Sequence, residues 1–186
     1  MTFLEKRNSD LNFKEKIKKI KALGMDIDGV LTDGKLFLLQ DDEVRFFNTK
    51  DGFGIRLLTL SGIKTVIITG KSSLSIKKRC LQLGIDYLYE NMKNKIIAME
   101  NFLQNENLSW DEVGFVGDDI PDIPLMEKVG FSAAPSDASD EVKKVSDFIC
   151  KNKGGEGAIR EVVELILKGQ KRWEKTLKLF FQNPGF

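Results

Sequence analysis

Two aspartates, Asp26 and Asp28, stand two residues apart where an apolar run ends, and Gly29 follows them directly. Successive side chains of a β-strand point to opposite faces, so these carboxylates can converge only if the chain leaves the strand between them. Glycine permits such a bend. A converging pair suits a hard cation and a phosphoryl group, because one carboxylate can attack phosphorus while the other transfers a proton.

More polar groups follow other apolar runs: Thr69, Lys95 at the start of a predicted helix, and the pair Asp118 and Asp119. Each alone is typical of a loop or a helix cap. Together with Asp26 they form an unusual set, since clustered carboxylates repel unless a cation neutralises them. The full sequence contains no histidine, and oxygen ligands without histidine or cysteine favour magnesium over zinc.

The spacing of apolar residues predicts the elements that must position these groups. Strands are expected at residues 22–26, 65–69, 87–89, 113–116, 131–133 and near 148, and helices at 11–20, 54–60, 73–83, 93–103, 124–128 and 158–167. Strands that alternate with helices indicate an α/β fold with a parallel sheet covered on both faces. Ligands of such sheets bind outside the carboxyl ends of the strands, which is where the polar groups fall.

The length and composition bound the remaining possibilities. A chain of 186 residues is expected to form one domain, with a flexible N-terminus over residues 1–9 and a C-terminal tail over 169–186. Its formal net charge of +1 argues against a nucleic-acid partner. Cys80 and Cys150 lack a CxxC spacing and are expected to be ordinary thiols. No run has the length of a membrane span, so a cytoplasmic protein is expected.

Several motifs extend the pattern along the chain. They are MDIDGVLTDG at 25–34, NTKDGFGIRLL at 48–58, VIITGKSS at 66–73, LGIDYLYEN at 83–91, VGFVGDDIPDIPLMEKVGFSAAPSDA at 113–138 and GGEGAIREVVELIL at 154–167. In this order they resemble the haloacid dehalogenase-like (HAD) phosphatases, in the small capless branch that contains 3-deoxy-D-manno-octulosonate 8-phosphate (KDO 8-phosphate) phosphatase and related sugar-acid phosphatases. The resemblance covers about residues 20–168. It implies a Rossmann-like core with a protruding β-hairpin at 35–48 in place of a cap domain.

The resemblance also implies roles for the polar groups. Asp26 would be the nucleophile that forms an aspartyl-phosphate, and Asp28 the general acid and base. Asp26, the backbone carbonyl of Asp28, and Asp118 would ligate Mg²⁺. Thr69 and Gly70 would bind the phosphoryl group, and Lys95 would stabilise it. Asp119 and Asp122 would support the metal site or cap the helix that follows.

The implied substrate is an acidic sugar phosphate of lipopolysaccharide biosynthesis. The residues expected to bind it are Asn48, Thr49, Lys50, Asp51, Gly52, Arg56, Gly70, Lys71, Arg79 and Lys95. A substrate with a carboxylate and a phosphate needs several cations. For Arg79 a solvated helix face beside two lysines is an equal alternative, and for Arg56 a surface helix position.

Capless members of this branch assemble as tetramers in which one subunit's hairpin covers the active site of the next. Here residues 35–48 would be that hairpin. Its apolar side chains, Leu36, Phe37, Leu38, Leu39, Phe46 and Phe47, are more than one face of an isolated hairpin can bury. The resemblance thus implies a homotetramer, and the apolar hairpin independently indicates a partner surface.

Two positions differ from the pattern of the KDO 8-phosphate enzymes and leave the substrate open. Lys71 takes the place of the arginine in the typical TGR motif, and Glu156 takes the place of the arginine in the typical GGRGA motif. Lysine lacks the bidentate fork of arginine. Phosphatases of sialic-acid-type 9-phosphates resemble this chain in having GGEG, so such a nine-carbon phosphate is the alternative substrate. A phospho-receiver signalling module is a further alternative, but it would lack a second aspartate two residues after its phosphoacceptor.

Overall fold

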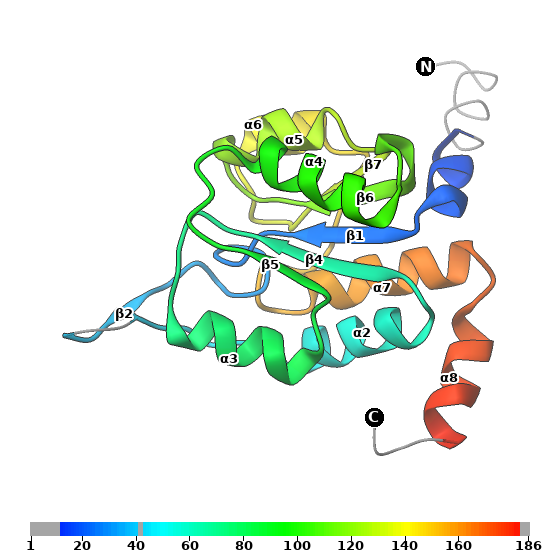
Figure 1. The fold of residues 1–186 in the computed structure, drawn as a ribbon, viewed down its shortest axis with the longest axis horizontal. Helices are drawn as coiled ribbons and strands as arrows, with labels where there is room; N and C mark the ends of the chain where they lie inside the picture. The colour runs from blue at the N-terminus through cyan, green and yellow to red at the C-terminus, as the bar shows by residue number, and fades with distance from the viewer. Residues whose placement is uncertain (1–11, 41–42, 183–186) are drawn as a thin grey trace.

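The computed structural model describes residues 12–40 and 43–182, so the expected flexible segment 1–9 lies outside the described residues. Its main feature is a sheet of six parallel strands, which confirms the predicted α/β class (Figure 1). In spatial order the strands are β5 (Tyr87–Tyr89), β4 (Lys64–Ile68), β1 (Ala22–Met25), β6 (Val113–Val116), β7 (Phe131–Ala134) and β8 (Phe148–Ile149).

Helices cover both faces of the sheet, as the alternation in the sequence predicted (Figure 1). Packed on one face are α2 (Thr49–Leu60), α3 (Leu74–Leu83), α7 (Ala158–Gly169) and the helix over residues 12–19. Packed on the other are α4 (Lys95–Glu106), α5 (Ile123–Met126) and α6 (Asp140–Val145). Each face has its own cluster of buried apolar side chains. Strands buried on both sides read as continuous apolar runs, which is why β1 and β6 were recognisable from the sequence.

The strand order places β1 at the centre, between β4 and β6. The chain leaves β1 for β4 on one side and returns to β6 on the other, so the connections diverge at the carboxyl end of β1. Open α/β sheets bind their ligands at such a point. The register pairs Met25 with both Ile67 and Val116. Residues just after these three therefore lie side by side on one rim.

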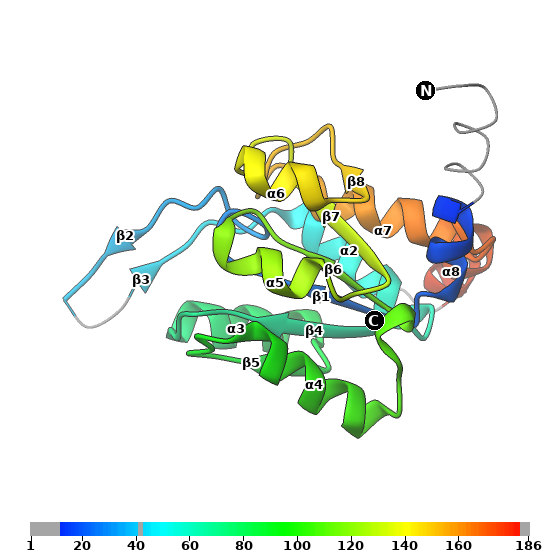
Figure 2. The same ribbon diagram turned by 90° about the horizontal axis from the view of Figure 1, so that it is seen from above.

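A hairpin projects beyond the carboxyl ends of the strands (Figure 2). Its short antiparallel strands, β2 (Phe37–Leu38) and β3 (Glu43–Val44), fall within the predicted segment 35–48. Phe37, Leu38 and Leu39 are mostly exposed, as is Phe46 near the base. This apolar surface has no cover within the described part of the chain.

Some elements differ from the sequence-based expectations. Helix α2 begins at Thr49 rather than Gly54, because the Asn48 side chain accepts hydrogen bonds from two backbone N–H groups and caps it. Helix α6 was not expected. The C-terminal segment forms a separate helix, α8 (Trp173–Gln182), which packs on α2. The ring centroids of Phe180 and Phe53 lie 4.9 Å apart at this contact. Within residues 12–40 and 43–182, no helix has the length and apolarity that crossing a bilayer demands.

Candidate active site

The side chains predicted to act in catalysis and metal binding lie at the carboxyl ends of β1, β4 and β6, together with Lys95 from α4. The backbone N–H of Asp26 donates to the carbonyl of Val116 at 3.0 Å, which extends the pairing of β1 with β6. The backbone N–H of Thr69 donates to Tyr89 at 3.0 Å, and the carbonyl of Thr69 accepts from Met92 at 3.0 Å. The ends of β1, β4 and β6 are thus held in place by backbone hydrogen bonds, and so are the side chains that follow them.

Gly29 lets the aspartate loop turn tightly beneath Asp118. Its φ is +85°, in the left-handed region that favours glycine. A Cβ at this position would lie 1.9 Å from a carboxylate oxygen of Asp118. The Asp118 side chain therefore packs directly on the glycine, and any larger residue would displace it.

Three carboxylates and one lysine form the floor of the site. Ligand oxygens of Asp26, Asp118 and Asp122 all lie within 4.8 Å of one another. The ammonium of Lys95, the first residue of α4, lies 2.8 Å from Asp26 and 2.6 Å from Asp122. Asp122 also accepts hydrogen bonds from the backbone N–H groups of Asp118 and Asp119. Because Asp122 is occupied by protein donors, it fixes the loop and Lys95, while Asp26 and Asp118 remain for a ligand.

The pKa values of this cluster report its crowding. The pKa of Asp26 is raised to about 6, because the effects of burial and of the neighbouring Asp122 charge together exceed the opposing effect of Lys95. The pKa of Asp118 is raised to about 8, mainly by burial and further by the charges of Asp26, Asp122 and Asp119. One lysine therefore does not offset the combined effect of burial and neighbouring carboxylates on Asp26 and Asp118. A divalent cation held by oxygen ligands would restore that balance.

Asp28 lies apart from this cluster and pairs with the base of the hairpin. Arg45 Nε lies 2.7 Å from Asp28 Oδ1, and Arg45 Nη2 lies 3.0 Å from Asp28 Oδ2. The same guanidinium donates to Glu43 at 2.7 Å and to the hydroxyl of Ser73 at 3.0 Å. Ser73 is the N-cap of α3. The second aspartate of the motif is thus bound to both the hairpin and α3.

A cavity of about 550 Å³ opens above these groups. Its lining contains nine of the predicted site residues, namely Asp26, Asp28, Thr69, Gly70, Lys71, Lys95, Asp118, Asp119 and Asp122. Gly34, Met92, Lys93 and Pro121 complete it. The Thr69 hydroxyl accepts from the backbone N–H of Lys71 at 3.2 Å, which shapes the loop after β4. Lys71 and Lys93 both have exposed side chains at this cavity.

The other predicted substrate-binding residues do not line this cavity in the single chain. Asp51 is buried and accepts from the backbone N–H groups of Gly157 and Arg160, so it caps α7. Arg79 donates to the carbonyl of Asn48 at 3.2 Å and lies over the ring of Phe47, at neither the cavity nor a solvated face. The remaining positions lie elsewhere on or before α2: Thr49, Lys50, Gly52, and Arg56 in a separate hollow near Gly84.

Three residues at or beside the site were not predicted from the sequence: Arg45, Lys93 and Met92. Arg45 lies within the apolar hairpin segment EVRFF, where a lone arginine could have signalled a buried ion pair. Asp122 completes the GDDxxD pattern, and its carboxylate returns to the backbone of the preceding turn. Lys93 had no signal of its own, since its place depends on the loop between β5 and α4.

The GGEG segment packs against the aspartate loop. The backbone N–H of Gly155 donates to the carbonyl of Val30 at 3.0 Å. A Cβ at Gly154 would lie 1.8 Å from the carbonyl oxygen of Gly29, so only glycine fits there. Glu156 is exposed, while its glycine neighbours make the contact. The segment therefore supports the loop that carries the two aspartates.

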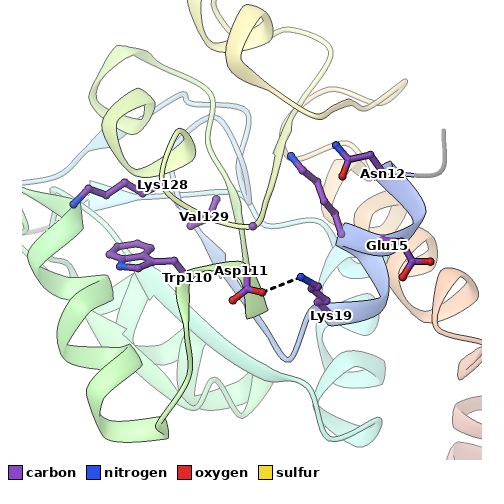
Figure 3. Close-up of a pocket in the computed structure, with 9 residues that line it drawn as sticks. Asn12, Glu15, Lys19, Trp110, Asp111, Lys128 and Val129 are labelled. Atoms are coloured by element: carbon purple, nitrogen blue, oxygen red, sulfur yellow. Dashed lines mark hydrogen bonds and ion pairs between the residues drawn. The ribbon is translucent and has the colours of Figure 1, made fainter. Parts of the chain in front are cut away.

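A second hollow, of about 400 Å³, lies at the opposite end of the sheet (Figure 3). Trp110, Asp111 and Gly130, which precede β6 and β7, contribute to its lining. Its charged groups already have partners: Lys19 lies 3.1 Å from Asp111, and Lys128 lies over the ring of Trp110 (Figure 3). Of these two cavities, only the one at the carboxyl ends of the strands contains the cluster of three carboxylates.

Comparison with known proteins agrees with this geometry. Residues 87–162 match the family model of the haloacid dehalogenase-like hydrolases. The chain is 39% identical over 162 residues to 3-deoxy-D-manno-octulosonate 8-phosphate phosphatase KdsC of Escherichia coli K12, which covers 87% of this chain and 86% of that protein.

Two solved structures illustrate the same likeness. A HAD superfamily (subfamily III A) hydrolase from Legionella pneumophila superposes with a TM-score of 0.92 at 35% identity, over 97% of this chain and 100% of that chain. KDO 8-phosphate phosphatase from Moraxella catarrhalis, solved with magnesium, phosphate and KDO, superposes with a TM-score of 0.87 at 34% identity, over 90% and 97%. The chain belongs to the haloacid dehalogenase-like hydrolases, in the family of the KDO 8-phosphate phosphatases.

Proposed function

We propose that this chain is an Mg²⁺-dependent phosphomonoesterase that hydrolyses KDO 8-phosphate to KDO and phosphate through an aspartyl-phosphate on Asp26. One observation carries the proposal: Asp26, Asp118 and Lys95 meet on the floor of a cavity that also contains the predicted phosphate ligand Thr69. The family relationship supplies the substrate. The M. catarrhalis relative was solved with KDO, phosphate and magnesium together.

The residues present fit a magnesium ion. The donor set consists of carboxylate oxygens, and burial together with neighbouring carboxylates raises the pKa values of Asp26 and Asp118, so a cation between them would stabilise their ionised forms. Asp26, Asp118 and the backbone carbonyl of Asp28 would hold the ion. When bound, it would neutralise charge on the phosphoryl group and on the carboxylates.

The chain's own residues account for the first half of the reaction. The Asp26 carboxylate attacks phosphorus in line with the bond to the sugar oxygen, and that bond breaks as the new one forms. Asp28 delivers a proton to the departing sugar oxygen, which would otherwise leave as a poor alkoxide. Lys95 and the backbone N–H groups after Thr69 balance the charge on the phosphoryl oxygens.

The second half reverses the role of Asp28. After the sugar departs, the Asp28 carboxylate accepts a proton from water while that water attacks the aspartyl-phosphate. Phosphate leaves and Asp26 is restored. Lys71 and Lys93, exposed at the cavity, are the cations available for the carboxylate of the sugar acid.

The substrate proposal is tested by measuring phosphate release from KDO 8-phosphate and N-acetylneuraminate 9-phosphate side by side, with magnesium and with EDTA. We expect magnesium-dependent hydrolysis with a preference of about a hundredfold for KDO 8-phosphate, which corresponds to about 2.7 kcal/mol of transition-state stabilisation. A preference for the nine-carbon phosphate would transfer the proposal to that substrate and identify Lys71 and Glu156 as its determinants.

Magnesium should stabilise the protein more strongly at high pH than at low pH. The pKa of Asp26 is raised to about 6 and that of Asp118 to about 8, above the ordinary value of 3.8. The metal-free folded protein then binds more protons than the unfolded chain between about pH 4 and 8, so its free energy of unfolding falls as pH rises through that window. We expect the Tm in EDTA to fall from about pH 5 to about pH 8, and magnesium to raise it more at pH 8. Equal gains at both pH values would contradict this account.

We further propose a homotetramer in which hairpin 35–48 covers a neighbouring active site. Support comes from Phe37, Leu38 and Phe46, which are 63%, 70% and 74% exposed at a projecting position. Apolar side chains gathered in this way indicate a partner surface. Light scattering of the purified protein should give four chains, and Phe37→Ser combined with Leu38→Ser should lower that number. A monomeric wild-type protein would contradict the proposal.

We also propose that the protein is cytoplasmic. Cys80 and Cys150 are buried free thiols, as expected in a reducing compartment. The test is fractionation of cells that express the protein with its native ends. Recovery with the membrane or periplasmic fraction would contradict it.

A further inference from the structure

Arg45 is the most deeply buried cation of the site, with a side chain that is 0% exposed. Burial of a guanidinium is unfavourable unless its donors are matched by acceptors. Arg45 satisfies this condition through four contacts, to both oxygens of Asp28, to Glu43 and to Ser73. Its burial is therefore explained by the groups it joins.

These contacts leave few guanidinium N–H donors of Arg45 available for a substrate. Nε and Nη2 donate to Asp28, Nη2 also donates to Glu43, and Nη1 donates to Ser73. Arg45 is also absent from the lining of the cavity, which Asp28 reaches. The guanidinium thus acts on the site through Asp28.

The geometry leaves Asp28 competent for proton transfer. Asp28 Oδ1 accepts from Arg45 Nε at 2.7 Å and from the hydroxyl of Thr32 at 3.5 Å. Within the described residues, Oδ2 accepts from Arg45 Nη2 alone. A carboxylate oxygen has two lone pairs, so Oδ2 keeps one for a proton while the other fixes its direction.

Without Arg45, the Asp28 side chain could adopt other orientations. Lys95 lies on the floor of the same cavity, where it already pairs with Asp26 and Asp122. Rotation of Asp28 toward that ammonium, or toward solvent, would remove it from the bridging oxygen of the substrate. A planar fork that binds both carboxylate oxygens prevents such rotation better than a single ammonium donor.

We propose that Arg45 is a positioning residue that holds the Asp28 carboxylate in line for proton transfer, so that the base of the hairpin is part of the catalytic apparatus of its own subunit. The inference rests on the proposed function in one respect, the assignment of proton transfer to Asp28. It adds a residue that acts through Asp28 and does not touch the substrate.

The test compares two substrates that differ in their need for a proton. The sugar phosphate releases an alkoxide and requires a general acid, whereas p-nitrophenyl phosphate releases a stable phenolate and does not. In Arg45→Met, we expect kcat/KM for KDO 8-phosphate to fall about 100-fold, within the range for loss of general acid catalysis. For p-nitrophenyl phosphate kcat/KM should change less than about threefold, because it reports steps up to formation of the phosphoenzyme.

The second half-reaction provides an independent readout. With p-nitrophenyl phosphate, Arg45→Met should show a burst of p-nitrophenol and accumulate phosphoenzyme, because a misplaced Asp28 activates water poorly. The amount of phosphoenzyme that accumulates in Arg45→Lys should lie between the amounts in wild type and in Arg45→Met, since a single ammonium binds one carboxylate oxygen well. An equal loss of kcat/KM on both substrates would overturn the inference.

Two further variants separate positioning of Asp28 from anchoring of the hairpin. The hydroxyl of Ser75 donates to the carbonyl of Glu43 at 3.0 Å and lies 2.9 Å from the hydroxyl of Ser73, so it joins the hairpin to α3 without touching Asp28 or Arg45 itself. Ser75→Ala should therefore leave the ratio of the two kcat/KM values unchanged, and a shift like that of Arg45→Met would overturn the inference. In an Asp28→Asn background, Arg45→Met should add less than about a twofold loss, because the two residues act as a unit.

Failure of the inference and failure of the proposed function give different results. If wild-type protein does not hydrolyse KDO 8-phosphate, the proposed substrate is wrong, and the comparison is made with whichever alkyl phosphate the wild type does hydrolyse. A different result excludes the positioning role alone. In that case the wild type is active, and Arg45→Met lowers kcat/KM equally for both substrates while its Tm and its response to magnesium match those of the wild type.

Discussion

Asp26→Asn is expected to lower kcat for KDO 8-phosphate by at least about 10⁴-fold, the scale of loss when an essential nucleophile is removed. The amide that replaces the carboxylate cannot form an acyl phosphate, while its size and its hydrogen-bonding capacity remain close to those of aspartate. The variant should still bind magnesium and substrate, because Asp118, Thr69 and Lys95 stay in place. Phosphate release and ligand-induced change in Tm, measured on one preparation, separate the two effects.

The matched control is Asp111→Asn. Asp111 lies in the hollow at the opposite end of the sheet, where its carboxylate pairs with Lys19 on the surface (Figure 3). Its loss should leave kcat within about twofold of wild type, since exposed ion pairs contribute little. Turnover of Asp26→Asn within about tenfold of wild type would exclude Asp26 as the nucleophile.

Lys95→Met is expected to have the second largest effect. It should lower kcat by about 10²–10³-fold, because a preorganised charge near the transferring phosphoryl group is lost. It should also destabilise the metal-free protein by roughly 3 kcal/mol near pH 8, because Asp26 and Asp122 lose their shared buried partner. The loss should shrink toward pH 5, where the carboxyl of Asp26, whose pKa is already raised to about 6, takes up a proton.

Lys128→Met is the control for this substitution. The ammonium of Lys128 lies at the surface, 3.7 Å from Glu100 and over the ring of Trp110. Denaturation curves of both variants with EDTA, at about pH 5 and pH 8, should show a pH-dependent loss for Lys95→Met only. A loss for Lys95→Met that does not depend on pH would mean that the ion pair to Asp26 is not the source of its stability.

The sheet and the floor of the site were predictable because their signals are local. The strands at 87–89 and 113–116 were placed correctly, since a parallel strand buried on both faces reads as an uninterrupted apolar run. Asp26, Thr69 and Asp118 each follow such a run, and parallel pairing then brings them to one rim.

The parts that could not be predicted depend on contacts between segments that are far apart in the sequence. Arg45 becomes a partner of Asp28 only when the hairpin returns over α3. Asp51 belongs to a motif expected to bind substrate, yet its carboxylate caps α7, more than a hundred residues later. The start of α2 was placed too late because the Asn48 cap extends the helix through Gly52, a residue with low helical preference.

The role of Asp26 as nucleophile is tested most directly by identifying the residue that is phosphorylated during turnover. Wild-type protein would be mixed with magnesium and ³²P-labelled KDO 8-phosphate, and the reaction quenched in acid within the first turnover. The protein would then be digested and its peptides identified by mass spectrometry. We expect label on the peptide that contains Asp26, conversion of that residue to homoserine by borohydride, and no label in Asp26→Asn. Rapid phosphate release without any labelled peptide, or label on a different residue, would contradict it.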